Sequence, residues 1–294
     1  MTLDAAARAL LGQARLGMLA LNTRRGPLVN PAAFAASGDS VWMTTSRQAV
    51  KVALARRDPR AAFLVDAGER AVELEGALEV LDVLSLSGGL KVALSPFSFA
   101  FGMAGYSWKN APFMAGYLVD VMGIPREWWP QNRVVLRLRV TSKRVLRLTR
   151  IDPRRSARVP GPPAPVQAAL GRVPVGYAAW DRAGSPVLTP CVWAVDGSDG
   201  LVWLPAGGHG AEPPPGTTAA LVVELHHRFR ATRMQGVCLR GRLAADDAAE
   251  DAVAARYSGG LGAGTAYRLR TERSSWWQGF KVETEVLTQA PSRR

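Results

Sequence analysis

The chain has 294 residues, of which 48% are hydrophobic and 21% charged. This balance is that of a globular protein, and the length allows two domains with separate cores. Lys and Arg outnumber Asp and Glu by 37 to 24, so the formal net charge is +13 and an anionic partner is favoured. The Arg residues form no basic block or aromatic-interleaved stripe. This argues against nucleic acid and leaves a phosphorylated small molecule, a membrane surface or compositional bias.

The N-terminal residues 3–13 are expected to form a helix, because their apolar side chains fall on one face. This segment lacks the regions of a signal peptide, so we expect a cytoplasmic protein. The two cysteines, Cys191 and Cys238, lie in apolar strand segments and are expected to be buried free thiols. The most apolar region, residues 90–124, is interrupted by prolines and charged residues, and no membrane span is expected.

Short apolar strands follow the helix expected at residues 3–13, and polar turns at Gly26 and Gly38 separate them. Helical periodicity begins at Ser46 and ends at Asp58-Pro59, where the proline breaks the helix. The strands expected in the first half cover residues 16–22, 28–35, 41–44, 61–65, 71–80, 134–140 and 144–148.

Residues 81–129 form an insertion that the second half lacks at this length, and they are expected to fold into two or three short helices. The insertion carries seven aromatic residues between Phe97 and Tyr117. Such residues are typical of a packed core, and the alternative is a lid over an apolar substrate.

The strand pattern recurs after residues 151–166, a Pro-rich segment that is expected to be a stiff linker. The spacing of roughly 160 residues exceeds that of repeat arrays and indicates a duplicated domain. The first domain is expected at residues 1–150 and the second at residues 167–294. Matching features of the two halves are Asn30-Pro31 with Thr189-Pro190, Val41-Trp42 with Val202-Trp203, and Gly76 with Gly241.

Many short antiparallel strands with one intervening helix per half predict a mainly β (α+β) protein in which each half closes into a small barrel. Sheet faces need burial, and two barrels packed side by side would bury one another. This is the arrangement of a homodimer fused into one chain, an intramolecular pseudo-dimer.

The end of the third strand carries the densest chemistry of the sequence. Thr44, Thr45 and Ser46 place hydroxyls directly before a helix whose first N–H groups lack partners. Arg47 and Lys51 are one helical turn apart and are therefore expected on a common face. Hydroxyls, a helix N terminus and two cations predict a phosphate site. The alternative is a capped helix with two solvated basic residues.

Three ordered segments of the first half resemble the pyridoxamine 5′-phosphate oxidase-like split-barrel flavoproteins. They are LGMLALNTRRGPLVNPAAF, WMTTSRQAVKVALARRDPRAAFLV and VELEGALEV. The resemblance covers about residues 3–80 and recurs more weakly in the second half. It implies two tandem split β-barrels with flanking helices, packed as a pseudo-dimer. It also implies a cofactor between the halves, which is FMN or the deazaflavin coenzyme F-420.

Two sets of residues match cofactor-binding positions of this family. The set that would hold the cofactor phosphate is Thr44, Thr45, Ser46, Arg47 and Lys51. The set that would pass under the isoalloxazine ring is Asn30, Pro31 and Ala32. The resemblance implies no catalytic residue, because in such proteins the cofactor supplies the chemistry.

The second half departs from this pattern where the phosphate-binding helix would begin. Residues 205–216 contain prolines that forbid the helix, and they include no Lys or Arg. We therefore expect that the second half has lost its own site but still walls the surviving one, so that one cofactor binds per chain. The second half could rebuild a site only with cations from elsewhere, for example Arg228, Arg230 or Arg233.

Other chemistries find little support in the sequence. His226 and His227 would point to opposite faces of a strand, and His209 is the only other histidine, so a metal site is not expected. No Ser-His-Asp arrangement is recognisable, and the glycine-rich residues 258–264 lack the Lys of a phosphate-binding loop.

The sequence thus predicts a flavin-dependent oxidoreductase acting on a small, largely apolar substrate. The alternatives are a deazaflavin-dependent reductase and a non-catalytic split barrel that binds haem or another cofactor.

Overall fold

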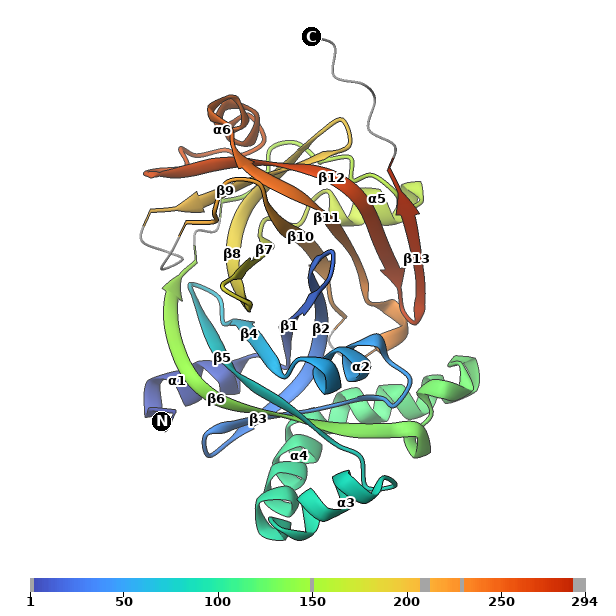
Figure 1. Ribbon diagram of the computed structural model, residues 1–294. Coiled ribbons are helices and arrows are strands. Elements are labelled where there is room, and N and C mark those ends of the chain that lie inside the picture. Colours follow the sequence, from blue (N-terminus) through green and yellow to red (C-terminus); the bar gives the residue numbers. More distant parts are fainter. Residues whose placement is uncertain (1–2, 149–150, 207–211, 228–229, 288–294) are drawn as a thin grey trace.

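The computed structural model describes residues 3–148, 151–206, 212–227 and 230–287, and most of its elements are strands (Figure 1). The strands of the first half pair in the order β1-β2-β3-β6-β5-β4, and β1 also pairs with β4, so the sheet closes into a barrel. They are β1 (Leu16–Thr23), β2 (Gly26–Ser37), β3 (Ser40–Ser46), β4 (Arg60–Asp66), β5 (Arg70–Leu81) and β6 (Arg133–Arg147).

The second half repeats this strand order. Its sheet runs β11-β10-β7-β8-β9-β12-β13, and β11 pairs with β12, so six strands again close into a barrel and β13 is added at the edge. The strands are β7 (Gly176–Arg182), β8 (Ser185–Asp196), β9 (Asp199–Pro205), β10 (Thr217–Leu225), β11 (Gln235–Ala245), β12 (Gly264–Gln278) and β13 (Lys281–Val286). The predicted fold class, mainly β with two tandem barrels and flanking helices, is confirmed.

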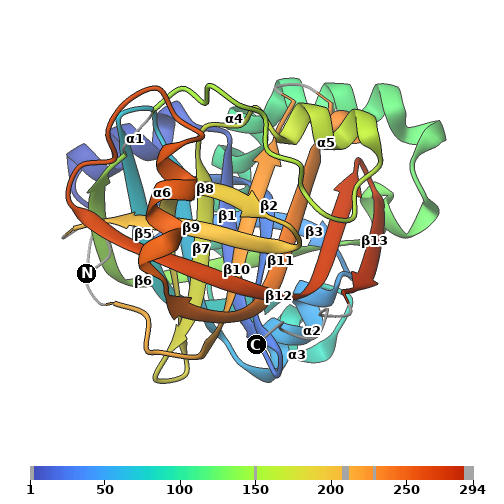
Figure 2. The same ribbon diagram turned by 90° about the horizontal axis from the view of Figure 1, so that it is seen from above.

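Helices flank both barrels, and each half has one before its first strand. Viewed from above, α5 and α6 lie on the second barrel (Figure 2), whereas α3 and α4 lie at the opposite end of the molecule (Figure 1). The helices are α1 (Ala5–Gln13), α2 (Val50–Arg57), α3 (Leu86–Ala93), α4 (Pro96–Asp120), α5 (Ala164–Leu170) and α6 (Asp247–Ala254). The 3₁₀ turns are η1 (Val121–Gly123), η2 (Arg126–Trp128), η3 (Pro130–Asn132) and η4 (Ala231–Arg233).

Two expectations for the first half are wrong. The strands expected at residues 134–140 and 144–148 are one continuous strand, β6, because Ser142 and Lys143 stay paired with β5 beyond a bulge at Gly76. The insertion contains one helix of 25 residues, α4, in place of short helices alone, and Pro112 lies within it. Helix α5 begins at Ala164, inside the segment expected to be a linker.

The two barrels pack through equivalent strands. β4 packs on β8 just as β10 packs on β2, and β1 packs on β8 just as β7 packs on β2. Asn22 and Asp181 occupy the same position in β1 and β7 and bond directly, from Nδ2 to Oδ2, at 2.5 Å. Equivalent surfaces in mutual contact define a pseudo-twofold axis between the halves.

The aromatic residues of the insertion divide between core and surface. Tyr106 and Tyr117 are buried, whereas Phe97 and Trp108 are 78% and 87% exposed. The buried tyrosines agree with the expectation of a packed core, whereas the exposed Phe97 and Trp108 do not. None of the helices in the described ranges is long and apolar enough to cross a membrane.

Candidate functional site

Thr44, Thr45 and Ser46 end β3, and the alternation of side chains along a strand divides them. The Thr44 hydroxyl lies 3.0 Å from the hydroxyl of Tyr106, and the Ser46 hydroxyl donates to a backbone carbonyl of η2 at 2.6 Å. Thr45 is 2% exposed and lies on the same face as Met43, which lines the barrel interior. Thr44 and Ser46 therefore share the outer face, while Thr45 points away from it.

Arg47 lies before α2, because the helix begins only at Val50. The expectation that Arg47 and Lys51 share a helix face is therefore wrong. Arg47 forms an ion pair with Asp82 at 3.0 Å, and the same carboxylate binds Arg56 at 3.2 Å. Since Arg47 already has an internal counter-ion, it contributes less free positive charge than the sequence indicates.

Lys51 stands in the first turn of α2, and its ammonium makes no hydrogen bond or ion pair within the part of the chain that the structure describes. Burial, followed by the nearby guanidinium of Arg133, lowers the pKa of Lys51 to about 8. A partly desolvated cation without a counter-ion among the described residues is unfavourable for folding, and perturbed groups of this kind are enriched at ligand sites.

Arg133 begins β6 opposite Ser46 and reaches back to β3. Its Nε and Nη2 donate to the Thr44 hydroxyl at 3.2 and 2.9 Å, and Nη2 also donates to the Thr44 carbonyl at 3.0 Å. Among the described residues no carboxylate pairs with Arg133, and its guanidinium carbon lies 5.5 Å from the centre of the Tyr117 ring. Lys51 and Arg133 thus form a two-cation cluster beside the N terminus of α2, which no side chain caps.

Sequence reasoning missed Arg133, Tyr106 and Tyr117. A signal for Arg133 existed, because it directly precedes the alternating segment VVLRLRV and an antiparallel register places it opposite the end of β3. The two tyrosines come from the insertion, and no local pattern connects them with β3.

Asn30, Pro31 and Ala32 lie on β2, against which both α4 and the second barrel pack. Ala32 belongs to the interior core of the first barrel, whereas Val29 belongs to the core between the barrels. By alternation, Pro31 shares the face of Val29 and Asn30 shares the face of Ala32. Of the three predicted residues, only Pro31 presents its side chain to the second barrel.

The second half has different residues at the positions of this cluster. The hairpins β2–β3 and β8–β9 have the same length, and counting from them places Trp203 at the position of Thr44. The sequence-based match of Trp42 with Trp203 is therefore wrong by two residues, an even offset that keeps both side chains on the outer face.

The partner strand confirms this correspondence. Arg133 stands opposite Ser46, and Gly264 stands opposite Pro205. A Cβ at Gly264 would lie 2.4 Å from the indole of Trp203, so the indole fills the space next to the glycine.

The remaining candidates lie elsewhere. Cys191 and Cys238 are free and buried, as expected. His226 Nδ1 lies 3.3 Å from Glu224 Oε2, a partner that the sequence did not indicate, and His209 lies outside the described residues. Within the described ranges, no group of three or more His, Cys, Asp or Glu residues is placed to hold a metal ion.

The lowered pKa of Lys51 gives the cofactor-free protein a pH dependence of stability. The folded-state pKa is about 8, against 10.5 for a free lysine. Between these values the unfolded chain binds the proton and the folded chain does not, so the free energy of unfolding rises with pH over this window. Urea unfolding at roughly pH 7.5, 9 and 10, values that span this window, is expected to show the rise in the free energy of unfolding. The rise is expected to be smaller for Lys51→Met. The pH dependence that remains in this variant comes from Lys109, whose pKa is also lowered to about 8 by burial and by the nearby Arg15.

Fold and site together define a class of protein: a tandem split barrel whose first half carries the Lys51–Arg133 pair of cations, with Trp203 and Gly264 at the positions that Thr44 and Arg133 occupy in the first half. No protein-family model and no curated protein matches the chain.

Solved structures similar to this chain cover about half of it. One is a pyridoxamine 5′-phosphate oxidase-related, FMN-binding protein from Nostoc punctiforme, 18% identical over 50% of this chain and 87% of its own, with a TM-score of 0.35. Another is an F-420 reductase, 19% identical over 48% and 98%, with a TM-score of 0.32. A FAD-binding protein from Mesorhizobium loti is 18% identical over 49% and 95%, with a TM-score of 0.31.

Proposed function

We propose that the protein binds one flavin-type cofactor per chain, FMN or the deazaflavin coenzyme F-420, and that it is an oxidoreductase. The observation that carries this proposal is the half-buried Lys51 side chain, whose ammonium lies without a counter-ion among the described residues, beside Arg133. Two cations at an uncapped helix N terminus suit a phosphate, because the free N–H groups and the helix dipole add to their attraction.

The residues of this chain fit such a phosphate in distinct ways. Lys51 supplies a compact charge, whereas Arg133 supplies a planar guanidinium whose orientation is fixed by Thr44. Tyr106 supports the Thr44 hydroxyl from α4. When bound, a flavin supplies the hydride or electron transfer, while the protein orients it and limits its contact with water.

Residues of the second half lie next to the proposed site in the first half, and this contact supports the proposal. Ala231, Met234 and Phe280 from this half pack against Tyr117 and Trp128 of the insertion. Asp120 at the end of α4 accepts a hydrogen bond from Thr232 at 2.6 Å and pairs with Arg230. The insertion therefore connects the two halves next to the cluster. We propose that this fused pair of barrels takes the place of a homodimer.

Titration of the cofactor-free protein with FMN, followed by fluorescence quenching, tests this function. We expect saturation at one FMN per chain, because Trp203 and Gly264 stand where the first half has Thr44 and Arg133. Riboflavin, which lacks the phosphate, is expected to bind at least about tenfold more weakly, since a charge-assisted contact contributes roughly 1.5–3 kcal/mol. Coenzyme F-420 in a parallel titration identifies the preferred cofactor.

Other results of the same titration would contradict the proposal. Equal binding of riboflavin and FMN would mean that the cations do not hold the phosphate. A stoichiometry near two would mean that the second half has rebuilt a site from other cations. Of the candidates for this, Arg230 is already paired with Asp120, and Arg228 lies outside the described residues. Absence of binding by either cofactor would reject the function itself.

A further inference from the structure

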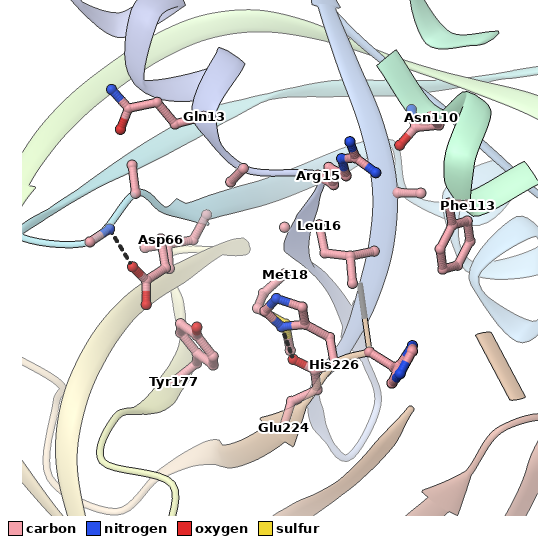
Figure 3. A pocket seen from close by; sticks show the side chains of 17 residues that line it. Gln13, Arg15, Leu16, Met18, Asp66, Asn110, Phe113, Tyr177, Glu224 and His226 are labelled. Carbon is pink, nitrogen blue, oxygen red and sulfur yellow. Dashed lines mark hydrogen bonds and ion pairs between the residues drawn. The ribbon is translucent and has the colours of Figure 1, made fainter. Parts of the chain in front are cut away.

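A cavity of about 580 Å³ lies between the two barrels, apart from the Lys51–Arg133 cluster (Figure 3). None of the eight residues predicted to bind the cofactor lines it. Its walls come from the start of β1, the β4–β5 turn, α4, and the ends of β7 and β10 that face them. The polar side chains that matter here are Arg15, Asp66, Asn110, Tyr177, Glu224 and His226.

The cavity lies across the pseudo-twofold axis. Met18 and Tyr177 both line it and occupy the same position in β1 and β7, each opposite the proline of the next strand. Asp66 and Glu224 also line it and occupy the same position at the ends of β4 and β10. In a symmetric homodimer each pair would consist of identical residues, but here both pairs differ. Fusion of the halves has therefore allowed the two sides of one cavity to become chemically distinct.

Three buried polar atoms at the walls have no hydrogen-bond partner within the described part of the chain: Arg15 Nη1, Asn110 Oδ1 and Glu224 Oε1. The amide of Asn110 is fixed in orientation, because its Nδ2 donates to the carbonyls of Phe34 and Tyr106 at 3.1 and 3.0 Å. One unsatisfied donor and two unsatisfied acceptors therefore remain. Buried polar groups without partners are unfavourable, and a ligand or ordered water normally satisfies them.

Opposite charges gather on different sides of this cavity. Arg15 lies beside Asn110 on one side, and Asp66, Glu224 and His226 lie on the others (Figure 3). The Glu224 side chain is 4% exposed and His226 is its only ion-pair partner among the described residues. Arg15, in contrast, forms no ion pair within the described residues. Where the His226 imidazole is neutral, the Glu224 carboxylate keeps its charge, and a ligand that matches both sides then carries a negative group and a positive group.

We propose that this cavity binds a small zwitterion that carries a carboxylate and an ammonium group. Arg15 receives the carboxylate, and Glu224 receives the ammonium. The volume falls within the range of small-molecule sites. Because the Arg15 and Glu224 atoms are themselves covered, the ligand reaches them after rotation of these two side chains about their terminal bonds, whereas the amide of Asn110 keeps the orientation set by its two hydrogen bonds.

Isothermal titration calorimetry with a series of linear ω-amino acids tests this proposal. The series runs from glycine to 8-aminooctanoate, a length of about the span of a drug-sized pocket. The protein is the cofactor-free full chain. Each amino acid is compared with the carboxylate and the amine of the same length. We expect at least one amino acid to bind at least about tenfold more tightly than either analogue, because each lacks one charge-assisted contact. Since no flavin is present, the result is independent of the proposed cofactor.

Two variants assign the ends of the ligand. Arg15→Gln is expected to remove the advantage of the amino acid over the amine, and Glu224→Gln its advantage over the carboxylate. Glu224→Gln keeps side-chain size, whereas Arg15→Gln also shortens the side chain. Glu272→Gln, at an exposed site on β12, controls for the change in charge. The proposal is overturned if no member of the series binds below about 10 mM, a free energy of roughly −2.7 kcal/mol. It is also overturned if both variants bind like the wild type.

Discussion

Replacing Lys51 with Met is expected to weaken FMN binding by roughly 10- to 100-fold and, at the same time, to make the cofactor-free protein more stable. Binding weakens because the phosphate loses its nearest uncompensated cation. Stability rises because the half-buried lysine is partly desolvated without a counter-ion among the described residues, whereas an apolar chain of similar length loses no hydration of a charge there. The free energy of unfolding at neutral pH should increase by about 1 kcal/mol, a value reduced for the remaining contact of the side chain with solvent.

Fluorescence titration with FMN and urea unfolding measure the two effects separately. Arg56→Met is the matched control, because Arg56 lies on the same helix but is exposed and paired with Asp82, so both quantities should change little. The double change of Arg47 and Lys51 to Ala should act mainly through Lys51, since Asp82 already neutralises Arg47. A Lys51→Met protein that is less stable yet binds FMN normally would show that Lys51 is a packing residue.

Replacing Gly76 or Gly241 with Ala is expected to lower the free energy of unfolding by about 3 kcal/mol or more. An added Cβ would lie 1.9 Å from the Arg139 carbonyl oxygen at Gly76 and 1.8 Å from the Arg270 carbonyl oxygen at Gly241. Both oxygens belong to the backbone of the neighbouring strand, which cannot withdraw without breaking the ladder. The two glycines stand at the register shifts of β5–β6 and β11–β12, so the two changes should have similar effects.

Circular dichroism during urea unfolding measures these losses. Gly105→Ala is the control, because a Cβ at this position of α4 meets nothing within 4 Å and alanine favours the helix. Its free energy of unfolding should rise by up to about 1 kcal/mol. If all three changes had the same small effect, the close approach of the strands at the bulges would not be a constraint.

The architecture could be predicted because its signals are local and repeated. Alternating apolar residues and turn glycines such as Gly26 and Gly184 mark hairpins, and their recurrence reveals the duplication. The exact correspondence of the halves was misjudged, because Val41-Trp42 and Val202-Trp203 look alike in sequence. Hairpin length fixes the register instead, and similarity of residue type does not override it.

The site was only partly predictable, because its charges are decided by residues far away in the chain. Thr44 and Lys51 lie at the predicted junction of strand and helix. Asp82, which pairs with Arg47, and Arg133, which approaches Lys51, come from beyond the barrel strands that suggested the site. Which cation keeps its charge free for a ligand is a property of the folded chain.

The pairing of Trp203 with Gly264 makes the loss of the second site hard to reverse. An arginine at position 264 would place its Cβ 2.4 Å from both the indole of Trp203 and the backbone oxygen of Leu204, so that step fails while the tryptophan remains and the strand keeps its place. Changing Trp203 first would leave a void where a fully buried indole had been, at a loss of about 3–5 kcal/mol. Whichever of the two substitutions comes first, the protein that carries it alone is less stable. The second half therefore cannot regain its site through single substitutions that each preserve stability.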